Sequence, residues 1–105
     1  MSQRSYPLDK QEDILRLISD PCARNIIYSI QIEPKSAVQI SNELGAELCT
    51  IYRRLHKFQK YDLLKITFQI TPNGKKSFYY QSKINSIMVR YQQGKFDVSL
   101  DFNQT

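Results

Sequence analysis

The spacing of apolar residues changes from a helical to a strand period near residue 62. Ile51, Leu55 and Phe58 stand four and three residues apart, which places them on one face of a helix from about Glu47 to Tyr61. From residue 64 to 70 every second residue is apolar instead, as in a strand with one buried face. A chain that changes period in this way is predicted to be α+β and mainly helical.

A short helix is predicted just before this one, with a tight turn between them. Ser36 is a suitable N-cap and Gly45 a suitable left-handed residue at the end of a helix that buries Ala37, Ile40 and Leu44. Two helices joined by such a glycine-containing turn form a helix-turn-helix.

Two further helices are predicted before residue 34. Asp9 is a candidate N-cap for the first, with Glu12 three residues later as in a capping box. Asp20 and Pro21 end that helix and begin the second, since proline is tolerated at the first helical position. The second helix is expected to end near Gln31.

A β-hairpin is predicted directly after the helix that ends near Tyr61. The alternating segment leads into a proline–asparagine–glycine turn at residues 71–74 and a returning strand through residues 77–80. This hairpin, at residues 65–80, is a predicted wing. Its buried face is expected to hold Leu64, Ile66, Phe68 and Ile70.

The last segment is open to two interpretations. Residues 84–91 fit a helical stripe and a strand equally well, whereas residues 96–102 alternate cleanly after Gln93 and Gly94, which suit a hairpin turn. A second β-hairpin is favoured over a terminal helix. The predicted fold is therefore a winged helix-turn-helix with three to four helices, a hairpin wing, and a C-terminal β-hairpin or helix. One domain is expected over residues 1–105, with a core at 9–83 and an extension at 84–105 for dimerisation or sheet extension.

Positive charge is concentrated in one half of the chain. Residues 50–95 contain ten lysines and arginines and the single acid Asp62, whereas residues 1–49 are slightly acidic. A polyanion partner and a basic face kept for solubility explain this block about equally well. No run is long enough to span a membrane and no signal-peptide core is present, so a cytoplasmic protein is expected.

The residues expected to meet double-stranded DNA follow from placing the helix at 47–60 in the major groove. Residues near its N-terminus approach bases and later ones approach phosphates, and Arg53 is the best candidate for reading guanine. The candidate base or groove contacts are Cys49, Thr50, Tyr52 and Arg53. The candidate phosphate contacts are Arg54, His56, Lys57 and Lys60, with Ser36 and Gln39 at the preceding helix. At the wing, Asn73, Lys75 and Lys76 are expected to meet the minor groove or its flanking phosphates.

Three segments resemble ArsR-type winged-helix regulators. They are Ile18-Ser19-Asp20-Pro21-Cys22-Ala23-Arg24-Asn25-Ile26-Ile27, then Ile40-Ser41-Asn42-Glu43-Leu44-Gly45 with Thr50-Ile51-Tyr52-Arg53-Arg54-Leu55, and Asp62-Leu63-Leu64-Lys65. Together they span roughly residues 10–81. The resemblance implies a compact winged domain, usually a homodimer, that binds a pseudo-palindromic operator and regulates transcription. Some archaeal members share the form of the tail, so an archaeal source is expected.

The chain departs from that family at three positions. Cys49 stands alone where metal-sensing members carry a pair of cysteines, Glu47 replaces a serine or threonine N-cap, and Asp62 replaces a glycine before the wing. Metal sensing is therefore not expected. Asp62 tolerates the left-handed angle that the glycine would adopt.

Other functions were weighed against DNA binding. No nucleophile–base set, phosphate-binding loop or metal-ligand spacing is visible, so no enzyme activity and no cofactor are expected. The alternative is a winged-helix protein-interaction module, which the rather apolar Leu48 and Cys49 at the head of the helix keep open. For a homodimer, the candidate surfaces are the N-terminal helix around residues 14–18 and the tail at 84–102.

Overall fold

The structure, a computed structural model, describes residues 2–103, with side chains from Tyr6 onward. The helices in this range are α1 (Leu8–Ser19), α2 (Pro21–Ser29), α3 (Ala37–Leu44) and α4 (Leu48–Lys60). The strands are β1 (Ser2–Ser5), β2 (Leu64–Ile70), β3 (Lys76–Ser82), β4 (Ile84–Gln92) and β5 (Lys95–Phe102). Among the helices described, none has the length and apolar character needed to cross a bilayer.

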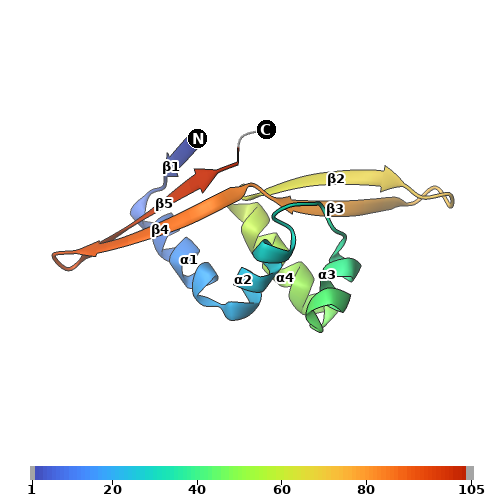
Figure 1. Cartoon of the computed structure of the whole chain (residues 1–105), viewed down its shortest axis with the longest axis horizontal. Coiled ribbons are helices and arrows are strands. Elements are labelled where there is room, and N and C mark those ends of the chain that lie inside the picture. Colours follow the sequence, from blue (N-terminus) through green and yellow to red (C-terminus); the bar gives the residue numbers. More distant parts are fainter. Residues whose placement is uncertain (1, 104–105) are drawn as a thin grey trace.

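The helices form one layer, and the strands run along one side of it (Figure 1). Hairpin β2–β3, the wing, extends past the helices at one end, and hairpin β4–β5 extends past them at the other. The molecule is consequently elongated, with principal extents of 56 × 29 × 21 Å.

The C-terminal segment is a β-hairpin, as the alternation of residues 96–102 favoured. Strands β4 and β5 pair antiparallel, and Gln93 and Gly94 between them adopt φ of 55° and 77°, as a type I′ turn requires. Strand β1 pairs with the other edge of β5, so the sheet order is β1-β5-β4. The sequence did not predict β1, because residues 2–5 are polar throughout and show no alternation.

The buried core joins the four helices to both sheets. In α4 the predicted stripe is confirmed, with Ile51, Leu55 and Phe58 at most 2% exposed. Ile14 and Leu17 of α1 also lie in the core. The surface around residues 14–18 is therefore poorly suited to the dimer contact that the sequence suggested. The remaining large members of the core are Ile26, Ile30, Ile40, Leu63, Leu64, Ile84, Val98, Leu100 and Phe102.

The start of α1 differs from the prediction. Pro7 occupies the N-cap position without a side-chain cap, and the Gln11 N–H donates to the Pro7 carbonyl at 2.9 Å. Asp9 lies inside the first turn, so the predicted capping box with Glu12 is wrong. The fixed φ of proline favours a helix start at this point, and Asp9 still faces the positive end of the helix dipole.

The other predicted helix boundaries are confirmed. Asp20 caps α2 by accepting a hydrogen bond from the Cys22 N–H at 3.2 Å, with Pro21 in the first turn. Gly45 ends α3 in a left-handed conformation with φ of 66°, and Asp62 adopts φ of 59° before the wing. These residues set the angle between α3 and α4 and the direction in which the wing leaves the bundle.

Only the inner half of the predicted apolar wing face is buried. Leu64 is 5% exposed and Ile66 is partly buried, but Phe68 and Ile70 are 52% and 67% exposed. The expectation that all four residues are buried was wrong, because the outer half of the wing extends beyond the helices that cover its base (Figure 1).

Candidate nucleic-acid interface

Helix α4 presents a polar and basic surface on the side opposite its buried stripe. The predicted contact residues on that surface are exposed. They are Cys49, Tyr52, Arg53, His56, Lys57 and Lys60. Thr50 is partly buried. Among the described residues, Arg53, Lys57 and Lys60 form no ion pair, so three cationic groups are available to a phosphate or a base edge.

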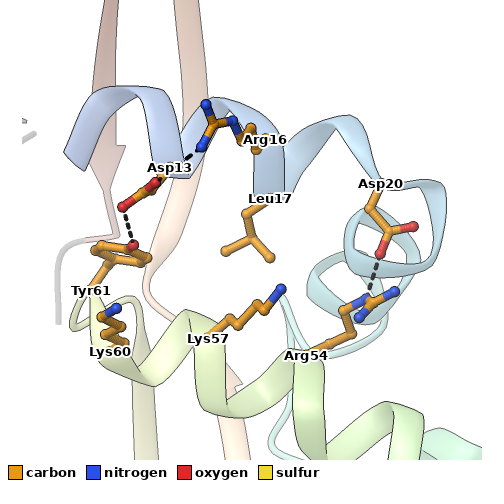
Figure 2. A pocket seen from close by; sticks show the side chains of 8 residues that line it. All are labelled: Asp13, Arg16, Leu17, Asp20, Arg54, Lys57, Lys60 and Tyr61. Carbon is orange, nitrogen blue, oxygen red and sulfur yellow. Dashed lines mark hydrogen bonds and ion pairs between the residues drawn. The ribbon is translucent and has the colours of Figure 1, made fainter. Parts of the chain in front are cut away.

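Arg54 is placed differently from the other cations of α4. Its Nε donates to Asp20 Oδ2, and its side chain is only 24% exposed (Figure 2). Partial desolvation raises the pKa of Asp20, but the hydrogen bond from Arg54 and those from the backbone outweigh it and hold the pKa below its usual value. Arg54 thus joins α4 to the junction between α1 and α2, whereas the sequence suggested a phosphate contact.

A groove with a volume of about 440 Å³ lies between α1 and α4, and its lining includes four basic and two acidic residues. Lys57 extends into it below Leu17, and Lys60 lies beside Tyr61 at its other end (Figure 2). The Tyr61 hydroxyl donates to Asp13 Oδ2 at 2.9 Å, and desolvation together with this carboxylate raises the pKa of Tyr61. The groove brings basic side chains of α4 together at one edge of its outward surface.

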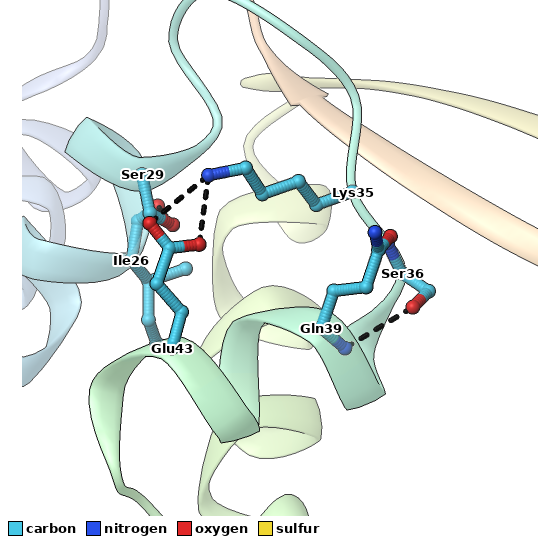
Figure 3. Close-up of polar contacts among 6 residues, drawn as sticks. All are labelled: Ile26, Ser29, Lys35, Ser36, Gln39 and Glu43. Atoms are coloured by element: carbon cyan, nitrogen blue, oxygen red, sulfur yellow. Dashed lines mark hydrogen bonds and ion pairs between the residues drawn. The ribbon is translucent and has the colours of Figure 1, made fainter.

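The start of α3 is fixed by the capping box that Ser36 and Gln39 form. The Gln39 N–H donates to Ser36 Oγ at 3.2 Å, and the Ser36 N–H donates to Gln39 Oε1 at 2.8 Å (Figure 3). Behind it, Lys35 Nζ contacts the Glu43 carboxylate at 2.7 Å. Both predicted contact residues therefore act as caps at the start of α3, and the Gln39 N–H is occupied by Ser36.

The wing carries the predicted residues Asn73, Lys75 and Lys76 at and beside its tip, where all three are exposed. The Lys76 ammonium lies 4.8 Å from the centre of the Phe68 ring. No aspartate or glutamate occurs in the sequence between Asp62 and Asp97, so the wing and all of β4 lack negative side chains.

The wing also carries exposed apolar residues, and two of them, Phe68 and Ile70, were expected on its buried face. Phe68, Ile70 and Phe78 are 52%, 67% and 47% exposed. The strict alternation could not distinguish them from buried residues, since it gives the face of a strand but not how far the covering helices reach.

The base of the wing lies close to α4. Tyr80 of β3 is partly buried, and burial followed by the proximity of Tyr52 raises the pKa of Tyr80. The connection between α2 and α3 pairs with the wing at this point, where Lys35 and Tyr80 exchange backbone hydrogen bonds of 3.0 and 2.8 Å. The base of the wing is thereby held against the α2–α3 connection.

Cys49 lies on the exposed face of α4, with its Sγ 3.6 Å from Glu47 Oε2. Cys22, the other cysteine, is partly buried in α2. Within the described part of the chain, no group of three or more histidine, cysteine, aspartate or glutamate side chains is arranged to hold a metal ion.

Comparisons with known proteins bear on the fold. No protein family and no curated protein sequence matches the chain. Among solved structures, the crystal structure of NolR from Sinorhizobium fredii is similar, with a TM-score of 0.57 over 78% of this chain and 83% of NolR. The chain has a winged-helix fold. At 17% sequence identity this likeness to NolR, a winged-helix transcriptional regulator, concerns the fold alone.

Proposed function

We propose that the protein binds double-stranded DNA and regulates transcription, with α4 in the major groove and the wing along the minor groove and backbone. The observation that carries the proposal is the exposed face of α4. Its Arg53, Lys57 and Lys60 form no ion pair with any described residue, and the wing that follows α4 has lysines and no acids. The similarity to NolR supports a regulator of this fold.

Within this proposal the residues of α4 divide by position. Arg53, with Cys49, Thr50 and Tyr52, reads base edges, since residues near the start of a recognition helix approach the groove floor. His56, Lys57 and Lys60 contact phosphates. We assign Arg54 to positioning, because its guanidinium is engaged by Asp20.

Two further elements complete the proposed interface. The Ala37 and Val38 N–H groups at the start of α3, which have no acceptor within the helix, face a phosphate together with Ser36 and Gln39. At the wing, Asn73, Lys75 and Lys76 contact the backbone and the minor groove.

We further propose an ArsR-type homodimer on a pseudo-palindromic operator, because one short helix reads few base pairs. Hairpin β4–β5 offers the contact surface, with Met88, Val89 and Tyr91 at 56%, 44% and 75% exposed. Sedimentation at micromolar concentration tests this proposal, and a species of 12.4 kDa alone would contradict it.

Binding to a fluorescent mixed-sequence duplex, measured by anisotropy over a salt series, tests DNA binding itself. The logarithm of the affinity should fall linearly with that of the salt concentration, by about 0.9 per phosphate contacted. Lys75→Ala and Lys76→Ala should each make the slope shallower by nearly this amount. Lys10→Ala, which removes an exposed lysine of α1 outside the proposed interfaces, is the matched control.

The alternative is a protein-interaction module that uses the same helix without touching DNA. It is supported by the apolar head of α4, where Leu48 and Tyr52 are 39% and 49% exposed. Absence of any binding to random duplex at low salt would favour this alternative and reject DNA binding.

A further inference from the structure

The outer half of the wing exposes several apolar side chains to solvent, beside its lysines. Ile70 is the last residue of β2, is 67% exposed, and precedes the exposed Pro72 by two positions. Soluble proteins usually place charged residues on such a projecting ribbon, since exposed apolar strands promote aggregation. We therefore expect the exposed apolar side chains at the tip to be covered by a binding partner.

The phenylalanines behind the tip have a structural role that does not need a partner. Phe68 and Phe78 face each other across the strands, with ring centres 6.2 Å apart, and the Lys76 ammonium lies over the Phe68 ring. Cross-strand aromatic pairs of this kind stabilise a hairpin. They stiffen the wing where it leaves the helices, but they do not involve Ile70 or Pro72.

The turn at the tip is itself held in one conformation. The Thr71 N–H donates to the Lys75 carbonyl at 2.8 Å, and the Gly74 N–H donates to the Thr71 carbonyl at 2.9 Å. The Lys75 N–H donates to Thr71 Oγ1 at 3.2 Å. Ile70 and Pro72 are thus presented on a rigid support, with two lysines immediately after the turn.

We propose that Ile70 and Pro72 form an apolar wedge that enters the minor groove, partly unstacks a base step and bends the duplex. This inference rests on the proposed DNA binding and adds to it a means of selecting deformable sequence. Apolar residues on minor-groove binders act in this way, and isoleucine and proline are both used.

Charge favours duplex DNA as the occupant of the tip. Lys75 and Lys76 flank the wedge, and no carboxylate occurs between Asp62 and Asp97 to repel a phosphate. A two-stranded ribbon fits the major groove of B-form DNA, about 12 Å wide, but is too wide for the undistorted minor groove, about 6 Å. A ribbon with side chains enters only when the groove widens, which couples insertion to bending.

The test uses the full chain and a 30-base-pair duplex that contains several TA steps. One of these steps carries 2-aminopurine, a base analogue whose fluorescence rises when it is unstacked. TA steps are chosen because pyrimidine–purine steps unstack most readily. The wild-type protein should raise the fluorescence at saturation. Energy transfer between dyes at the two ends of the same duplex should report a shorter end-to-end distance.

The decisive variant is Ile70→Thr, which keeps a β-branched residue at an exposed strand position. It should abolish most of the fluorescence rise and the shortening, and weaken binding about fivefold through the lost apolar contact. The salt slope should stay unchanged, because no phosphate contact is removed. Ile32→Thr makes the same chemical change at a loop residue that is 91% exposed and should match the wild type.

Each outcome decides between the two proposals. If the wild type does not bind the duplex at all, the proposed function fails. If it binds with no unstacking or bending, or if Ile70→Thr unstacks the duplex as the wild type does, DNA binding stands and the wedge is rejected. Binding to anionic phosphatidylserine vesicles that Ile70→Thr abolishes, with no unstacking of DNA by the wild type, would assign the tip to a membrane surface.

Discussion

Asp20 acts where α1 ends and α2 begins, and it has two roles there. Its Oδ1 accepts the Cys22 N–H as the N-cap of α2, and its Oδ2 accepts the Arg54 guanidinium from α4. The first role could be predicted from the Asp-Pro sequence. The second could not, because Arg54 is 34 residues away and only the packing of three helices brings the two groups together.

The charge of Asp20 makes stability depend on pH in a defined direction. Its pKa is lowered in the folded protein. The carboxylate therefore adds stability at pH values above the unfolded pKa, about 3.9, and this contribution is lost as the pH falls towards the folded pKa. Asp20→Asn keeps an N-cap but removes the charge, so its melting temperature should lie below that of the wild type near neutral pH. The gap should close on acidification. A gap that is constant from neutral pH to pH 3 would contradict the role of the ion pair.

At the scale of the elements, the sequence predicted which segments form helices and hairpins better than it predicted which of their residues are buried. Residues that fix a local conformation could be predicted from the sequence, such as Ser36 as the N-cap of α3 and Gly45 as the left-handed residue that ends it. How far the helices extend over the wing could not be predicted. Phe68 and Ile70 alternate with polar residues as a buried strand does, yet no local pattern shows that the helices end short of them.

In the candidate interface too, features set by the local sequence could be predicted, whereas features set by tertiary packing could not. The outward face of α4 followed from its buried stripe, so Arg53, Lys57 and Lys60 were predicted to be exposed and are. The engagement of Arg54 by another helix was missed, because the helical period places that residue only between the buried and outward faces.

Neighbouring arginines of α4 should therefore separate stability from DNA binding. Arg53→Gln removes an exposed side chain and should change the free energy of unfolding by less than about 0.5 kcal/mol. It should weaken duplex binding by about tenfold or more. Arg54→Gln should lower the melting temperature and affect binding less. Thermal unfolding and anisotropy on both variants measure this, and equal loss of stability would refute the division.

At the scale of the whole molecule, Gln11 joins the two ends of the described chain to the helical layer. Its Nε2 donates to the Tyr6 carbonyl, and its Oε1 accepts the Val98 N–H of β5 at 2.9 Å. Gln11 is buried, with 5% of its surface exposed. Sequence reasoning assigned Gln11 no role, since a buried glutamine on a helix gives no periodic signal.

Gln11→Ala should lower the free energy of unfolding by about 2 kcal/mol, because it leaves the buried Val98 N–H without an acceptor. Urea denaturation measures the loss, and the Val98 amide should exchange its hydrogen faster than in the wild type. The exposed Lys10→Ala is the control. Binding to duplex DNA at low salt should persist, because the affected contacts lie at the sheet opposite the wing.

The pairing of β1 with β5 also sets an order in time. Ser2 lies opposite Phe102, so the two strands come together only by closing a loop of nearly the whole chain. Contacts between residues so far apart in sequence form late, whereas the helices and the wing depend on nearby partners. On the ribosome, the half of the protein that carries α4 and the wing emerges before β5 does. During synthesis, α4 and the wing can therefore form while β1 has not yet paired with β5.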